Sequence, residues 1–402
     1  MKAVIRSAAL ALGVVALGVA GMGAASAQGV QNAPIRYQAA DGAGKSFGVA
    51  FPSLRLADPL VSARVNALLH HLVLRTLPPD AVPAAGAPPL ALPAREQTAM
   101  LNSLEVSGVA LLNGGRVLRV SVTREGCGAY CASSTETLAF DARTGRLLAL
   151  PELLTPAGMA SLARQAAQAH QATLKYTLAQ LDKGLRAAKP GSQEASRAQE
   201  QIQMYEECLQ QRFGSGGSLA GLYQDEPGFF LVREGGLSFE QGQCSVHQNQ
   251  ALDELGALVY APGADALRPH LSAYGRALVL GEGGAEGAQP PAPLNPYAQL
   301  FKGKIDGRLP VTLFLGASRT VMPGQMKPFS DAVYYYDKYR QPIALTVERQ
   351  GAAGFTLTEA APEAAQPGQP APARLVFRIE GRTLKGQWHG EGKTYAFEAT
   401  AL

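Results

Sequence analysis

The sequence has few charged residues and little net charge. Only 17% of its 402 residues are Asp, Glu, Lys or Arg, and the formal net charge is +4. Without Lys2 and Arg6, which lie in the N-terminal segment discussed below, about +2 remains. A charge of this size produces no strong electrostatic field. Lys and Arg do not cluster among aromatic residues, so we expect no nucleic-acid partner.

The sequence also lacks the motifs of common catalytic and metal sites. Its six histidines include no pair at the helical spacing of a metal site, and it has no Gly-x-Ser-x-Gly segment. The Gly-rich runs at 214–217 and 281–287 lack the Lys and Ser/Thr of a phosphate-binding loop. We therefore expect no metal, no cofactor and no enzymatic activity.

Two histidine positions need separate comment. His70 and His71 are adjacent on a predicted helix, where neighbouring side chains face different ways, so we interpret them as structural. His247 follows Cys244 by three residues and could activate a thiolate, which leaves a catalytic alternative. A disulfide at Cys244 would remove that alternative.

The N-terminal segment contains a long stretch without charge. Met1–Arg6 is basic, Ser7–Gln28 has no charged residue, and the stretch ends with Ala25-Ser26-Ala27. A basic start, an apolar middle and a small-residue cleavage site predict a secretory signal peptide over 1–27. The alternative is an uncleaved membrane anchor, because about 20 apolar residues can span a bilayer.

The rest of the sequence extends this prediction. No Cys lies near the cleavage site, so we expect no lipid anchor. A second apolar run of spanning length is also missing, so we expect no integral membrane segment after signal cleavage. The mature protein is thus predicted to be soluble, and periplasmic or secreted.

The four cysteines are Cys127, Cys131, Cys208 and Cys244. In an oxidising compartment an even number predicts two disulfides, and three pairings are possible. We favour Cys127–Cys131, which would close a tight loop, and Cys208–Cys244, which would join a helix to a later strand. A zinc site is the alternative, but it needs a second short cysteine spacing that the sequence lacks.

Hydrophobic patterns divide the mature chain into two predicted domains. Residues 28–280 are predicted to be an α/β sandwich-like domain with a helical hairpin at about 156–188 and 193–212. Asp58 and Pro59 predict the start of an earlier helix, and Thr155 and Pro156 the start of the hairpin. Strands are predicted at 46–56, 100–112, 117–123, 134–141, 229–232, 236–239 and 257–260, and a helical turn or short helix at 267–274.

The second domain is separated from the first by a Gly/Pro linker at 281–296. Residues 297–402 are predicted to be a small antiparallel β-barrel, giving the whole chain an α+β fold. Its strands are predicted at 301–306, 309–316, 331–337, 342–349, 353–359, 374–380, 382–389 and 393–401.

Part of the first domain resembles a known family. The stretch Gly126-Cys127-Gly128-Ala129-Tyr130-Cys131 is followed by Phe140-Asp141-Ala142-Arg143-Thr144-Gly145 and by Leu150-Pro151-Glu152-Leu153-Leu154. This order resembles the extracytoplasmic PdaC/RsiV-like family over about 45–280. The family accompanies peptidoglycan deacetylases and forms the outer part of a lysozyme-sensing anti-sigma factor. Tyr130 stands where the family has His, and the two cysteines flank its loop.

The resemblance implies binding to a cell-wall component or to a wall-cleaving enzyme. By this likeness Gly128, Ala129 and Tyr130 are candidate binding residues, held in one shape by the predicted disulfide. The alternative is that the disulfide only stiffens a hairpin.

Aromatic residues of the second domain are the other candidates. On a strand, Tyr334 and Tyr336 share one face and Tyr335 takes the other. With the single tryptophan, Trp388, they could form an aromatic binding surface. The alternative is that they are core and rim residues of the barrel.

We therefore expect an exported, non-catalytic binding module of the bacterial cell envelope, with peptidoglycan or a lysozyme-type enzyme as partner. A small-ligand carrier that uses the barrel, and a wall-acting hydrolase, are the alternative functions.

Overall fold

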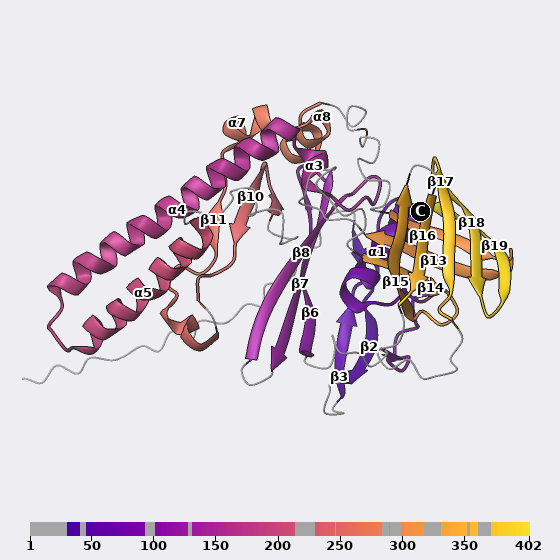
Figure 1. The fold of residues 1–402 in the computed structure, drawn as a ribbon, viewed down its shortest axis with the longest axis horizontal. Helices are drawn as coiled ribbons and strands as arrows, with labels where there is room; N and C mark the ends of the chain where they lie inside the picture. The colour runs from indigo at the N-terminus through magenta and orange to yellow at the C-terminus, as the bar shows by residue number, and fades with distance from the viewer. Residues whose placement is uncertain are drawn as a thin grey trace, which may run out of the picture.

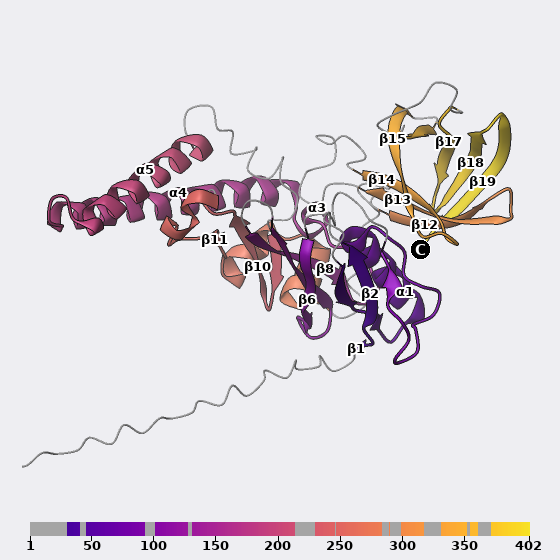
Figure 2. The ribbon, with the colours of Figure 1, turned by 90° about the horizontal axis from the view of Figure 1, so that it is seen from below.

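The computed structural model describes residues 30–40, 46–92, 101–127, 131–213, 230–245, 247–283, 289, 299–316, 331–351, 354–360 and 371–402. The chain is α+β, as predicted: small sheets and a helical hairpin are followed by a closed antiparallel barrel (Figure 1). The hairpin and the barrel lie at opposite ends, and the sheets lie between them (Figure 2). The predicted signal peptide and most of the predicted linker fall outside the described residues, so the domain boundaries stay predictions. No helix in the described ranges is long and apolar enough to cross a membrane.

Short strands and one helix begin the described chain. Strand β2 (Ile35–Ala40) pairs antiparallel with β3 (Ser46–Phe51) and parallel with β5 (Leu90–Ala91). Strand β1 (Gln31–Asn32) pairs with β4 (Leu54–Arg55). The single strand predicted at 46–56 is therefore two strands, broken at Pro52, which has no backbone N–H to donate to a ladder.

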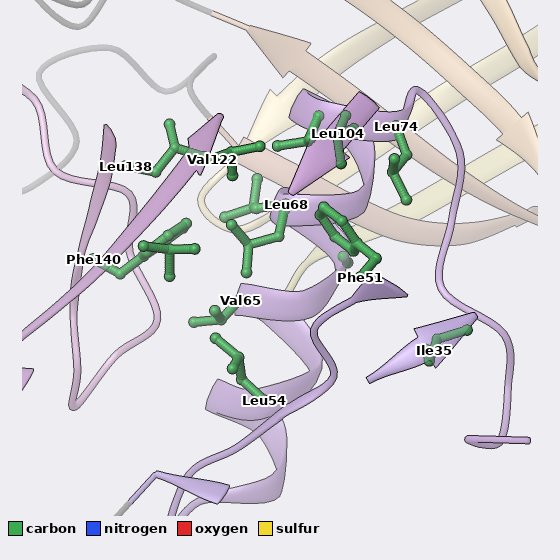
Figure 3. Packing of buried hydrophobic residues seen from close by; sticks show 14 of the residues in the cluster. Ile35, Phe51, Leu54, Val65, Leu68, Leu74, Leu104, Val122, Leu138 and Phe140 are labelled. Carbon is green, nitrogen blue, oxygen red and sulfur yellow. The ribbon is translucent and has the colours of Figure 1, made fainter. Parts of the chain in front are cut away.

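Helix α1 (Pro59–Leu69) begins as predicted. The Asp58 side chain accepts a hydrogen bond from the Leu60 amide, and Pro59 occupies the first turn. A π-helical turn, η1 (His70–Leu74), continues the helix. Val65 and Leu68 of α1 pack in one buried cluster with Val122 and Phe140 (Figure 3).

The central sheet has the order β6–β7–β8 and is antiparallel. Its strands are β6 (Leu101–Leu112), β7 (Val117–Cys127) and β8 (Cys131–Asp141). Alternating residues of β7 bury different faces, because Val120 and Val122 pack against α1 while Val117 packs against the hairpin region. The turn between β6 and β7 has positive φ at Asn113 and Gly114, the backbone conformation that Asn and Gly adopt in hairpin turns.

The helical hairpin agrees closely with its prediction. Helix α4 (Pro156–Ala187) is capped by the Thr155 hydroxyl, which accepts from the Gly158 amide at 3.0 Å, and α5 (Gln193–Phe213) runs back along it. The Cys208–Cys244 disulfide is present, with Cα atoms 5.5 Å apart. It joins α5 to the segment after β10, not to the strand itself.

A small sheet and several short helices follow the hairpin. The sheet contains β9 (Phe230–Arg233), β10 (Gly236–Gln241) and β11 (Leu258–Tyr260), and η2 (His247–Leu252) lies before β11. The helical turn or short helix predicted at 267–274 is part of a longer series of short helices over 264–280, interrupted at Leu271. They are α7 (Ala264–Leu267), η3 (Arg268–His270), α8 (Ala273–Gly275) and η4 (Arg276–Leu280). Small α3 (Leu150–Leu153) packs on α8.

All eight strands predicted for the barrel are present, and β12 closes it by pairing with β19. The strands are β12 (Gln299–Ile305), β13 (Leu309–Gly316), β14 (Asp331–Tyr336), β15 (Pro342–Gly351), β16 (Gly354–Glu359), β17 (Arg374–Glu380), β18 (Thr383–Gly390) and β19 (Lys393–Ala401). Phe377 contacts both Phe355 and Phe397, with ring centroids 5.6 and 6.2 Å apart, so side chains fill the middle of the barrel.

The outer face of β12–β14 is buried against the first part of the chain. Leu300 and Phe314 belong to the same apolar cluster as the α1 side chains, and Val333 and Tyr335 pack on Leu77. The Thr76 hydroxyl donates to the Arg340 carbonyl at 2.9 Å. The barrel therefore docks on α1 and the segment that follows it.

Candidate functional site

The tyrosines of β14 alternate between the two faces of the barrel wall. Tyr334 and Tyr336 share one face, which points inward, with their ring centroids 5.4 Å apart, and Tyr336 is only half-buried. Tyr335 points outward but is 0% exposed, because η1 and Leu77 cover it. Of the three tyrosines, the half-buried Tyr336 is therefore the one placed to meet a ligand.

Trp388 lies on the opposite side of the barrel and also points inward. It is directly across from Tyr395 in the β18–β19 ladder, and the two rings stack at 5.8 Å with 23° between their planes. Both rings are half-buried. Gly390 is required beside them, because a Cβ at this position would collide with the indole.

These aromatic side chains lie toward the same end of the barrel. Tyr336 and Glu359 end β14 and β16, Trp388 lies near the end of β18, and Tyr395 lies near the start of β19. In an antiparallel barrel these strand ends lie on the same rim. We call Tyr334, Tyr336, Glu359, Trp388 and Tyr395 the barrel mouth. Tyr334 lies one layer deeper than the others.

The mouth holds a carboxylate among neutral phenols. The Tyr334 hydroxyl donates a hydrogen bond to the Glu359 carboxylate. Burial raises the pKa of Tyr334 well above its usual range, and the neighbouring Glu359 raises it further. Burial also raises the pKa of Tyr336, and the charges of Glu359 and Glu391 add to that rise. Both tyrosines are therefore neutral at physiological pH, and the site carries negative charge.

The indole nitrogen of Trp388 is a hydrogen-bond donor without a partner among the described residues. Nε1 is buried, and buried N–H groups normally have a partner. Because Nε1 has almost no solvent-accessible surface, a ligand acceptor would reach it only if the ring moved.

The other predicted site residues are only partly described. Gly128, Ala129 and Tyr130 lie outside the described residues, as do the side chains of Cys127 and Cys131. The backbone register of β7 and β8 runs to the end of the hairpin and pairs position 127 with position 131. The Cys127–Cys131 disulfide and the binding role of the loop stay predictions.

The Phe140–Gly145 motif has a structural role in this chain. Asp141 is buried and accepts hydrogen bonds from the Arg143 amide and the Tyr274 hydroxyl, both at 2.9 Å. Arg64 of α1 donates to the Thr144 carbonyl. The motif thereby joins the central sheet to α1 and to the short helices after β11.

The nearby Glu152 is also structural. It is buried and forms an ion pair with Arg146. Burial raises the pKa of Glu152, and the positive charge of Arg146 opposes that rise. The carboxylate is therefore engaged in holding α3 to the preceding turn.

A polar cleft of about 440 Å³ lies between the β6–β7 turn and the end of η4. Glu234 accepts from the Asn113 amide, and Asn113 Oδ1 accepts from the Gly235 amide at 2.7 Å. Arg116 donates to the Ala277 carbonyl at 3.0 Å and to that of Gly283 at 3.2 Å. Because its polar groups bond to one another and to the backbone, we interpret this cleft as a structural junction.

Two mouth residues were not predicted from the sequence. Tyr395 could have been found, because the Glu391-Gly392 turn sets a hairpin register that places Tyr395 opposite Trp388. The sequence around Glu359 does not indicate a binding site, because its hydrogen-bond partner Tyr334 lies on a strand distant in the sequence. Within the described ranges, no three His, Cys, Asp or Glu side chains are grouped as metal ligands.

The chain has limited similarity to known proteins in both sequence and structure. No protein-family model matches the chain, and no curated protein matches it. A DUF3298 family member from Bacteroides fragilis is 11% identical, with a TM-score of 0.34, over 60% of this chain and 93% of that chain. A DUF3298 family protein from Pseudomonas aeruginosa PAO1 is 13% identical, with a TM-score of 0.33, over 60% of this chain and 94% of that one. The candidate site therefore rests on this chain's own residues.

Proposed function

We propose that the protein is an exported, non-catalytic binding protein of the bacterial cell envelope, and that the barrel mouth binds peptidoglycan. The observation that carries this proposal is the stacked, half-buried Trp388–Tyr395 pair, which shares one rim with Tyr336. Rigid aromatic rings offer a large contact area at a low cost in conformational entropy. The apolar faces of sugar rings suit such a surface.

Export is the second part of the proposal. It is supported by the basic start, the uncharged stretch and the small-residue cleavage site of residues 1–27. Mass spectrometry of protein recovered from the periplasm or medium should give a chain that starts near Gln28. Recovery of the intact chain in the cytoplasm would contradict it.

The filled barrel interior favours a site at the mouth over the carrier alternative. Phe355, Phe377 and Phe397 occupy the middle of the barrel, so an apolar ligand would have to displace packed rings. A polymer chain lying across the mouth requires no such displacement.

The binding test uses the purified, oxidised mature chain and peptidoglycan sacculi. We expect saturable co-sedimentation of the protein with sacculi. Trp388→Ala and Tyr395→Ala should each weaken it at least tenfold, because each removes one ring of the stacked pair. Tyr176→Ala is the matched control, since Tyr176 is 67% exposed on α4, at the end of the molecule away from the barrel.

Two results would overturn the proposal. One is the absence of retention on sacculi, and the other is wild-type retention of both mouth variants. Immobilised lysozyme is included as a second probe. If the protein binds lysozyme but not sacculi, the partner is a lysozyme-type enzyme and not peptidoglycan. Tyr130→Ala in the same assay tests the predicted contribution of the 128–130 loop.

A further inference from the structure

The charge at the barrel mouth points to the part of the ligand that enters it. Glu359 lies on the same face of β16 as Phe355 and Leu357. Those two side chains belong to the barrel core, so Glu359 also points inward. Its hydrogen-bond donor is the neutral hydroxyl of Tyr334. Among the described residues, no ion pair includes Glu359. A carboxylate is thus held at the site beside a neutral partner.

A second carboxylate reinforces this negative charge. Glu391 occupies the β18–β19 turn at the same rim, and its charge acts on Tyr336 from across the mouth. Cationic side chains on the neighbouring turns already have interactions: Arg308 pairs with Asp306. Lys338 Nζ lies 5.4 Å from the centre of the Tyr339 ring. Arg374 and Lys393 start β17 and β19 at this rim, but no ion pair joins either of them to Glu359 among the described residues, so the carboxylates of the mouth still favour a positive group.

The remaining walls of the mouth suit a compact cation. The faces of Tyr336, Trp388 and Tyr395 can attract an ammonium group through their negative π-electron density. Partial burial strengthens this attraction and the attraction to Glu359, because water screens both of them less. A divalent metal would need several oxygen ligands, and the part of the chain described here holds no such group.

We propose that the barrel mouth selects a primary ammonium group, such as the side-chain amine of a diamino acid in a wall peptide. This inference rests on the proposed function and specifies its ligand. In this arrangement the ammonium donates to Glu359 and lies against the aromatic rings. The adjoining sugar or peptide then covers the Trp388–Tyr395 pair.

The sequence provides a direct reporter for the test. Trp388 is the only tryptophan in the chain, so intrinsic tryptophan fluorescence reports on the mouth alone. The probe is Nα-acetyl-L-lysine amide, and its Nε-acetylated form, which lacks the positive charge, is the control compound. We expect a saturable fluorescence change with the amine. Binding of the acetylated probe should be at least tenfold weaker.

Substitutions test whether Glu359 causes the preference for the amine probe. Glu359→Gln keeps an acceptor for the Tyr334 hydroxyl but removes the charge, and it should weaken amine binding at least tenfold. Glu380→Gln is the matched control, because Glu380 ends β17 at the other end of the barrel. Equal binding of the two probes would overturn the inference. This comparison uses the unmodified protein and so does not depend on the folding of any variant.

A parallel assay separates this inference from the proposed function. Sacculi are treated with acetic anhydride to block their amines, and retention is compared with that on untreated sacculi. Loss of retention on treatment supports the ammonium assignment. Equal retention overturns the ammonium assignment but leaves peptidoglycan binding standing, whereas no retention on either material overturns the proposed function.

Discussion

His71 Nδ1 lies 2.7 Å from the hydroxyl oxygen of Tyr335, which joins η1 to the outer face of the barrel. Both side chains are 0% exposed. The His71 ring also lies 3.8 Å from the Phe314 ring, centre to centre. Its neighbour His70 turns the other way, toward Tyr37 and Phe51 of the first sheet. One pair of adjacent histidines therefore bonds to two different parts of the molecule.

Tyr335→Phe tests the first of these contacts. The substitution keeps the ring but removes the hydroxyl that bonds to His71, in a site without water access. We expect the free energy of unfolding to fall by about 1–2 kcal/mol in urea denaturation. Tyr339→Phe, on the exposed turn, should change it by less than about 0.5 kcal/mol. Equal stabilities of the two variants would show that the buried hydrogen bond contributes nothing.

The pH dependence of stability should reflect His70. Its Nδ1 lies 2.8 Å from the Asn66 carbonyl and its Nε2 lies 3.0 Å from the Tyr37 hydroxyl, a pattern that fits a neutral ring. Burial, opposed by the hydrogen bond to the Asn66 carbonyl and aided by the positive charge of Arg340, lowers the pKa of His70 from 6.5 to about 4. Between these values the unfolded chain binds a proton that the folded chain does not. Stability from this group is therefore constant above pH 6.5 and falls as pH drops toward 4.

The size of this effect can be bounded. A difference of about 2.5 pKa units corresponds to at most about 3.4 kcal/mol. Urea unfolding at pH 7, 5.5 and 4.5 should show the decline, and His70→Gln should have a shallower decline than the wild type. His389→Gln, at the partly exposed end of β18, is the control and should keep the wild-type slope. The same slope in all three proteins would refute the assignment to His70.

The Cys208–Cys244 disulfide should stabilise the hairpin. It links residues separated by 36 positions, and Cys208 packs with Met204, Tyr205 and Leu258. A loop of this length predicts a loss of about 2–4 kcal/mol in the Cys208→Ala/Cys244→Ala protein, measured by denaturation under oxidising conditions. Reductant should destabilise the wild type more than this variant. Peptide mapping without reductant also tests the predicted Cys127–Cys131 bond.

The sequence allowed good prediction of elements whose pattern is local. The cap residues Thr155 and Pro156 set the start of α4, and alternation located the barrel strands within two residues. The sequence did not predict the separate short helices over 264–280. Pro269 and the Ser272 cap divide an apolar stretch that otherwise suits one helix.

Contacts between distant segments were beyond prediction. Alternation places Tyr335 on the outer face of β14, but only docking on η1 explains its burial. Glu359 likewise belongs to the site only because β12 pairs with β19 and closes the barrel. These contacts depend on tertiary packing, which no local spacing encodes.

Two glycines with similar backbone conformations should respond differently to alanine. Gly145 has φ of +69° and Gly191 has φ of +75°, a region that favours glycine in both cases. A Cβ at Gly145 would lie 3.0 Å from the Val61 carbonyl oxygen of α1, whereas a Cβ at Gly191 meets nothing within 4 Å. Gly191→Ala should therefore cost only the conformational strain, about 1 kcal/mol.

Gly145→Ala should cost that strain and also the close approach to α1, for a total of about 2–3 kcal/mol. Urea denaturation of the two variants under the same conditions gives the difference directly. The difference isolates the packing of the Phe140–Gly145 motif against α1, because the φ values are nearly matched. Equal losses would mean that α1 moves away without cost, and the motif would then not fix the position of this helix on the central sheet.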